Sequence, residues 1–178
     1  SFLEKDPLMR AAIVLHVLAG LVLVANVDAG VAITPGPSVA VNLSPFGATN
    51  DMRYQQIYDA SLFVNPAFGP GATGPIAITA LRFSPDVSGT YTADVTIGLN
   101  QTTVAVGALG TSLNGNITGS LTTVFQDPSF SQAVIGGDLT YTLKFDFSAN
   151  PFIYDPTGGQ NLLIDFVVKN KAGGFLFY

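Results

Sequence analysis

The chain has 178 residues, of which 48% are hydrophobic and 11% charged, with a formal net charge of −5 and no cysteine or tryptophan. Its one histidine (His16) and its one glutamate (Glu4) precede Gly30, so aspartate supplies every carboxylate side chain of residues 30–178. That composition excludes Ser-His-Asp and Cys-His catalytic sites, and zinc sites built from His or Cys, from this part of the chain. Because there is no basic patch, nucleic acid is not an expected partner.

Residues 9–29 have the pattern of a secretory signal peptide. Arg10 is followed by an apolar run over residues 11–25 that only His16 interrupts. A run of this length suits the hydrophobic helix of a signal peptide, whereas a membrane-spanning helix needs about 20 apolar residues. We expect signal peptidase to cleave after Ala29. The alternative is a retained N-terminal anchor.

The signal peptide divides the chain into three segments. Residues 1–8 are interpreted as translated sequence upstream of the true start, and residues 9–29 as the signal peptide. Residues 30–178 are long enough for one ectodomain that buries about two-thirds of its extended surface. Its apolar ending, GGFLFY, predicts an ectodomain that is truncated at the C-terminal side.

Beyond the signal, apolar and polar residues alternate with a period of two, which is typical of antiparallel strands with one buried face. The predicted strands cover residues 39–43, 53–63, 76–83, 90–100, 117–125, 138–148 and 161–170. The alternation predicts these inward-facing residues: Tyr91, Ala93, Val95, Ile97, Leu99, Leu139, Tyr141, Leu143, Phe145, Phe147, Leu162, Ile164, Phe166 and Val168. Asp165 and Lys169 are predicted to face outward.

Stretches rich in Pro, Gly, Asn and Asp separate the predicted strands and predict turns. Asn114-Gly115 predicts a tight hairpin, and the QDPS stretch at residues 126–129 predicts another turn. Residues 102–110 are compatible with strand, loop or a short helix. The pattern as a whole predicts an all-β fold, an antiparallel β-sandwich of jelly-roll type, preceded by the N-terminal hydrophobic signal helix.

Four motifs occur along the ectodomain: RYQQIYDASLF at residues 53–63, ITALRFSPD at 78–86, PFIYDP at 151–156 and NLLID at 161–165. In this order they resemble the motifs of exported bacterial PEP-CTERM proteins. The resemblance covers most of the ectodomain.

The resemblance implies a secreted β-sandwich at the cell surface of a Gram-negative, biofilm-forming bacterium. It also implies sorting by an exosortase that recognises a C-terminal tail with a Pro-Glu-Pro motif, a hydrophobic helix and a basic cluster. No such tail occurs within residues 30–178. The family implies no catalytic residues.

The strand predicted at residues 53–63 places Tyr54, Gln56 and Tyr58 on one face. Tyrosine rings can stack on sugars while a glutamine amide binds hydroxyls, so these three residues are the candidate glycan-binding site. The alternative is an edge or lid strand whose tyrosine and glutamine side chains satisfy neighbouring backbone groups. An exposed aromatic strip at Tyr54 and Tyr58 would favour glycan binding.

Calcium is the metal ion that the composition allows, because it takes oxygen ligands from Asp, Asn and backbone carbonyls. The candidate ligands are Asp86 in SPDVSG, and Asp155 and Asn161 in YDPTGGQN. Aspartate beside Pro or Gly is also an ordinary turn residue, which is the alternative interpretation. No other cofactor is expected.

Three functions of different classes remain. A non-catalytic structural or adhesive protein of the extracellular polysaccharide matrix explains the signal, the missing catalytic side chains and the resemblance together. A carbohydrate-binding module that uses strand 53–63 is the second, with exopolysaccharide or other surface glycans as partners. An enzyme that uses two aspartates about 5 to 9 Å apart is the third, but scattered aspartates always allow some pair, so we do not expect an enzyme.

Overall fold

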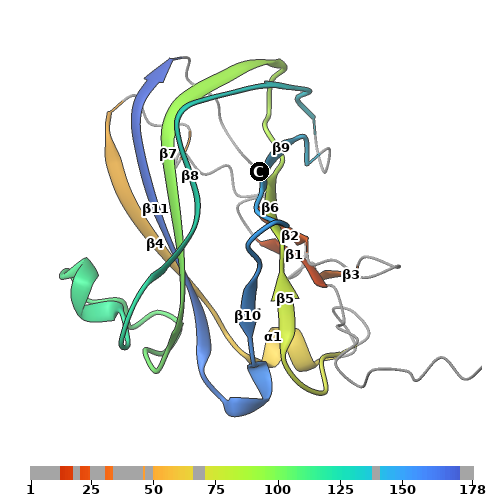
Figure 1. The fold of residues 1–178 in the computed structure, drawn as a ribbon, viewed down its shortest axis with the longest axis vertical. Coiled ribbons are helices and arrows are strands. Elements are labelled where there is room, and N and C mark those ends of the chain that lie inside the picture. The colour runs from red at the N-terminus through yellow and green to blue at the C-terminus, as the bar shows by residue number, and fades with distance from the viewer. Residues whose placement is uncertain are drawn as a thin grey trace, which may run out of the picture.

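The computed structural model describes residues 13–17, 21–24, 31–33, 46, 50–65, 71–137 and 141–172. Strands dominate these residues (Figure 1). Their bounds are β1 (Ile13–Val17), β2 (Leu21–Val24), β3 (Val31–Ile33), β4 (Met52–Tyr58), β5 (Ile76–Ile78), β6 (Ala80–Phe83), β7 (Gly89–Thr102), β8 (Thr122–Val134), β9 (Leu143–Asp146), β10 (Phe152–Tyr154) and β11 (Asn161–Ala172). The helical segments among them are α1 (Ser61–Val64), η2 (Leu113–Asn116) and η3 (Pro156–Gly158).

The strands form two layers that face each other (Figure 1). One layer is the antiparallel sheet β4-β11-β7-β8. The other contains the sheet β3-β1-β2-β6-β9 and the pair β10-β5. Thr79 alone separates β5 from β6, and its carbonyl accepts a hydrogen bond of 2.8 Å from Phe147 N. Every pairing is antiparallel except β1 with β3, which confirms the predicted all-β, mainly antiparallel class.

The core lies between the layers. Many of its side chains come from the alternating apolar positions of β7 and β11. All the inward-facing residues predicted on these two strands are buried. Phe46 lies at the centre of an aromatic cluster, with its ring centroid 4.5 Å from that of Phe83 and 5.4 Å from that of Phe145. Burial of large apolar side chains of this kind is the dominant favourable contribution to folding.

Residues 103–121 connect β7 to β8 and lie against the side of the β4-β11-β7-β8 sheet that faces away from the second layer (Figure 1). We call them the covering segment. The tight hairpin predicted at Asn114-Gly115 is wrong, because both residues belong to η2 within this long connection. Leu121 packs over Gly98 of β7, and a Cβ on Gly98 would come within 2.6 Å of the leucine side chain.

Strand β8 passes through the turn predicted at residues 126–129. Asp127 pairs with Val95 and Phe130 with Ala93, so two residues of β8 stand opposite one residue of β7. This register shift is a β-bulge that contains Pro128. The strand continues because β8 is the edge of its sheet, where a proline without an N–H group can be accommodated.

Several predicted strand boundaries change in the structure. The strand predicted over 53–63 ends at Tyr58, because Asp59 Oδ1 accepts a 2.8 Å hydrogen bond from Ser61 N and a short helix follows. The strand predicted over 117–125 begins only at Thr122. Within the strand predicted over 138–148, the described residues form a strand only at β9, where Leu143 and Phe145 are buried as predicted. Leu139 and the strand predicted at 39–43 lie outside the described residues.

Two segments of the predicted signal peptide are strands in the structure. β1 pairs with β2, and β2 pairs with β6. Both β1 and β2 lie in the segment for which a hydrophobic helix was predicted. A short run of Val, Leu and Ile does not distinguish a strand from a helix by periodicity, and an open sheet edge offers it backbone partners. No helix among the described residues has the length and apolar character that crossing a membrane requires.

Candidate functional site

The outer face of the β4-β11-β7-β8 sheet carries buried polar side chains, which is unusual for the solvent side of an antiparallel sheet. Gln55, Asn100, Thr102 and Asp165 come from three neighbouring strands, and Asn116 comes from the covering segment. The covering segment removes all of them from solvent. Buried polar groups of this kind must be hydrogen-bonded to be tolerated.

An ion pair between Arg53 and Asp165 lies at the centre of this region. Asp165 stands directly opposite Gln55 in the register of β11 and β4, which makes Arg53 its diagonal neighbour on the same face. Arg53 Nε donates to Oδ1 (2.9 Å) and Oδ2 (3.0 Å) of Asp165, and Nη2 donates to Oδ2 at 2.6 Å. The side chain of Asp165 is 1% exposed, whereas that of Arg53 is 31% exposed. The hydrogen bonds to Asp165 raise the pKa of Arg53, so the guanidinium group stays protonated at every ordinary pH.

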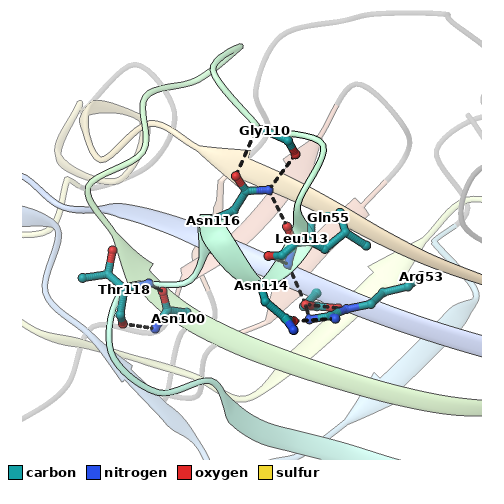
Figure 2. Close-up of polar contacts among 9 residues, drawn as sticks. Arg53, Gln55, Asn100, Gly110, Leu113, Asn114, Asn116 and Thr118 are labelled. Atoms are coloured by element: carbon teal, nitrogen blue, oxygen red, sulfur yellow. Dashed lines mark hydrogen bonds and ion pairs between the residues drawn. The ribbon is translucent and has the colours of Figure 1, made fainter.

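Gln55 connects this ion pair to the covering segment (Figure 2). Its Nε2 donates to Asp165 Oδ2 at 2.7 Å and to the carbonyl of Leu113 at 2.9 Å. Its Oε1 accepts a 2.9 Å hydrogen bond from Asn116 Nδ2. All the hydrogen-bonding groups of this amide except one lone pair are therefore used inside the protein.

Asn116 and Asn114 continue the network into the covering segment (Figure 2). Asn116 closes a small ring with Gly110, since its Oδ1 accepts from Gly110 N (2.9 Å) and its Nδ2 donates to Gly110 O (3.2 Å). Asn114 Oδ1 accepts a 2.8 Å hydrogen bond from Arg53 Nη1. Arg53, Gln55, Asp165 and Asn116 together form what we call the anchor network, which fixes the covering segment on the sheet.

A second attachment lies at the end of β7, where Asn100 takes the place of missing strand partners. Its Nδ2 donates to the carbonyls of Thr118 (2.8 Å) and Ser120 (3.0 Å), and its Oδ1 accepts from Thr118 N (3.0 Å). Thr102 Oγ1 donates to the carbonyl of Asn116 at 2.9 Å. Figure 2 shows Asn100 and Thr118 beside the anchor network.

The side chains of the anchor network are occupied by one another and by the covering segment. A general acid or base must reach the substrate proton within hydrogen-bonding distance. Asp165 is buried, and its oxygens already accept hydrogen bonds from Arg53 and Gln55. An arginine that binds a carboxylate through two nitrogens gives a strong and geometrically specific pair.

The part of the chain that the structure describes includes two open pockets on this sheet. The larger, of about 300 Å³, is at the end of β7 next to the covering segment. Most of its lining consists of amide and hydroxyl side chains: Asn100, Gln101, Thr118, Ser120, Thr122 and Gln160. Phe152 is its aromatic member. The smaller, of about 200 Å³, lies over β7, β8 and β11 near the β-bulge, and its polar lining is Asp94, Thr96, Gln126, Asp127 and Lys169.

The predicted glycan strip lies on the core-facing side of β4. Tyr54, Gln56 and Tyr58 stand opposite Phe166, Ile164 and Leu162 of β11, whose side chains are all in the core. Tyr58 is 3% exposed, and its hydroxyl has no hydrogen-bond partner within the described part of the chain. Tyr54 is partly buried against the core. Strand β4 therefore does not present an exposed strip that contains both tyrosine rings.

The candidate calcium ligands lie at two ends of the sheet. Asp86 precedes Gly89, the first residue of β7, whereas Asn161 pairs with Thr102, the last residue. A strand of 14 residues separates those ends by about 45 Å at the usual rise per residue. Asp155 Oδ1 accepts from Thr157 N and Oγ1, and Asn161 bonds the backbone of Ala60 and Val104. Within the described residues no group of three or more acidic, His or Cys side chains could hold a metal ion.

The anchor network was not predicted, although the alternation pattern of the sequence already indicated on which face some of its side chains lie. Alternation places Arg53 and Gln55 on one face of β4, the face opposite Tyr54 and Tyr58. Asp165 was predicted to face outward, which is correct, but its burial depends on a segment that is distant in sequence. The attachment of Asn116 to Gln55 could not be inferred from spacing.

Comparison of the chain with protein-family models, with curated proteins and with solved structures gave no match. The resemblance to exported PEP-CTERM proteins therefore stays a prediction from the sequence motifs.

Proposed function

We propose that this chain is a non-catalytic structural or adhesive protein, exported to the surface of a Gram-negative cell and associated with the extracellular polysaccharide matrix. The observation that carries the proposal is the use of the buried polar side chains. Gln55 bonds directly to Asp165 and to Asn116, and Gln55 and Asn116 also bond to backbone carbonyls, so that these side chains hold the covering segment on the sheet. This is the chemistry of a stable binding or structural domain.

The proposal includes a particular fold and route of export. Two facing layers of antiparallel strands around one aromatic core support a β-sandwich, for which we propose jelly-roll type. The apolar run over residues 11–25 supports export by a signal peptide. Surface sorting by an exosortase rests on the motif resemblance alone.

Export is tested on the full chain with a C-terminal epitope tag in a Gram-negative host. We expect a periplasmic or secreted product that begins at Gly30, which would lack β1 and β2. The control carries Leu15→Arg and Leu23→Arg, which interrupt the apolar run and should leave the uncleaved chain in the cytoplasm. A folded wild-type product that retains residues 9–29 would contradict the signal peptide.

Association with the matrix is tested on the same tagged chain, added to the washed matrix of a Gram-negative biofilm. We expect retention that is lost when the polysaccharide is digested and kept when matrix protein is digested. Release from the untreated matrix by a low-salt wash would overturn the proposed function. The second candidate, a carbohydrate-binding module, is favoured by the larger pocket but not by the buried Tyr58.

A further inference from the structure

We propose that the larger pocket, at the end of β7, is a binding site for a neutral saccharide. The inference rests on the proposed function, because it names the class of matrix component that the domain would hold. The pocket forms where β7 and β8 separate. Their last paired residues are Leu99 and Thr122, and beyond them the side chain of Asn100 takes over the hydrogen bonds of the missing strand.

The pocket presents polar groups that the protein itself does not use. The hydroxyls of Ser120 and Thr122 and the side-chain amide of Gln160 form no hydrogen bond within the described part of the chain. Gln101 uses only Oε1, which accepts from Asp155 N at 3.2 Å, so its two Nε2 protons point to no described partner. Donors and acceptors of this kind match the vicinal hydroxyls of a sugar.

One wall of the pocket is apolar. Phe152 is partly buried, packs against the core and contributes to the pocket lining. An aromatic surface beside a few placed polar groups is the usual composition of a small-molecule site. The C–H faces of a pyranose ring would lie against such a surface while its hydroxyls reach the amides.

Charge selects among sugars. None of the described residues that line this pocket is charged, in contrast to the smaller pocket with Asp94, Asp127 and Lys169. An acidic sugar would find no cation there, and the net charge of −5 would repel a polyanion. The volume of about 300 Å³ lies at the lower end of the range for ligand pockets, which suits one or two sugar units.

The pocket is also held in shape before any ligand binds. Asn100 fixes the backbone of Thr118 and Ser120 through three hydrogen bonds. The anchor network fixes the preceding part of the covering segment. A preformed site loses less conformational entropy on binding, which favours affinity for a weakly interacting ligand such as a sugar.

The test is affinity gel electrophoresis of the full chain through gels that contain dextran, laminarin, galactomannan or hydroxyethyl cellulose, with alginate as the anionic polymer. The pocket variant combines Ser120→Ala, Thr122→Val and Gln160→Met, which remove only side-chain groups that the protein leaves free. We expect the wild type to be retarded by at least one neutral polymer and not by alginate. The variant should bind that polymer at least about tenfold more weakly, since three hydrogen bonds are lost.

The matched control makes the same three types of substitution outside the pocket, at positions on β8: Thr123→Val, Gln126→Met and Ser131→Ala. Those side chains are exposed, lie outside the pocket and form no hydrogen bond within the described residues. Both variants should melt within about 3 °C of the wild type, and the control should keep wild-type affinity.

Three outcomes would overturn the inference: equal binding by the pocket variant, equal loss in the control, or no retardation by any neutral polymer. None of them bears on retention by the matrix, which decides the proposed function separately. Retention on the matrix without binding in the pocket would leave the domain structural or adhesive. Loss of matrix retention in the wild type would remove the proposed function itself.

Discussion

The two faces of strand β11 differ in what decides their burial. On the inner face, Leu162, Ile164, Phe166 and Val168 are all fully buried. On the outer face, burial falls along the strand: Leu163 and Asp165 are buried, Val167 is partly exposed and Lys169 is exposed. The inner face is covered by the opposite layer from Leu162 to Val168, whereas the outer face is covered only where residues 103–121 lie on it. Alternation therefore determines orientation, and coverage determines burial.

The two faces also differ in how they treat polar groups. On the outer face the covered groups of Gln55, Asp165 and Asn116 are paired with one another and with backbone. On the inner face Tyr58 carries a buried hydroxyl without a described partner. An unpaired buried polar group costs free energy, whereas a paired one contributes a modest net gain. Removing a paired polar group on the outer face should therefore lower the free energy of unfolding, whereas removing the unpaired hydroxyl on the inner face should not lower it.

The largest effect is expected from breaking the ion pair. Asp165→Ala should lower the free energy of unfolding by about 2 to 4 kcal/mol, because Arg53 and Gln55 lose the carboxylate acceptor that they share under the covering segment. Asp94→Ala on the same outer face, where the aspartate is only partly buried, should cost less than about 1 kcal/mol. Urea unfolding monitored by tyrosine fluorescence measures both.

The partner variant Arg53→Ala sharpens that measurement. In a double-mutant cycle the two substitutions should be coupled by at least about 1 kcal/mol, since they remove the same contact. Additive losses, or an Asp165→Ala variant as stable as the wild type, would show that the anchor network does not hold the covering segment.

A smaller effect is expected from the packing of Leu121 over Gly98. Gly98→Ala should destabilise by about 1 to 3 kcal/mol, because the new Cβ would meet Leu121 at 2.6 Å. Gly74→Ala, where no atom lies within 4 Å of the added Cβ, is the control and should change stability little. Adding Leu121→Ala should recover part of the loss at residue 98. If the combined losses are simply additive, Leu121 does not pack on this face.

The smallest effect is expected from two buried tyrosines. Tyr58→Phe should leave stability unchanged or raise it by up to about 1 kcal/mol, because the hydroxyl has no described partner. Tyr154→Phe should lower it by about 1 kcal/mol, because its hydroxyl donates a 2.7 Å hydrogen bond to the carbonyl of Gln160. Thermal melts at neutral pH distinguish the two, and a loss of equal size in both would contradict the assignment.

The same pair predicts a dependence on alkaline pH. Burial raises the pKa of both Tyr58 and Tyr154 above the ordinary value of 10.0. The unfolded chain therefore loses these protons first, so the stability is complete below pH 10 and falls as the pH rises above it. Each phenylalanine variant should remove one part of this alkaline loss. A wild-type stability that does not change between pH 9 and pH 11 would contradict the burial of these phenols.

Much of the core could be predicted, and little of the site. Tyr91 to Leu99 and Leu162 to Val168 alternate so regularly that their inner faces follow from the period of a strand. The anchor network joins residues of β4, β11 and the covering segment that are up to 112 positions apart. Their hydrogen bonds require the register of β4 on β11 and the path of residues 103–121. The tight hairpin predicted at Asn114-Gly115 would have left Asp165 in solvent.

By itself, the sequence determined the all-β class, the inner faces of β7 and β11, and the absence of imidazole and thiolate chemistry after Gly30. These depend on residue type and on a period of two, which are local properties. Only the tertiary structure decided that Tyr58 is buried, that Asp165 is paired, and that an open polar pocket forms at the end of β7. Each of these depends on which distant segment covers a face, and free energies of burial and pairing arise only when that segment is in place.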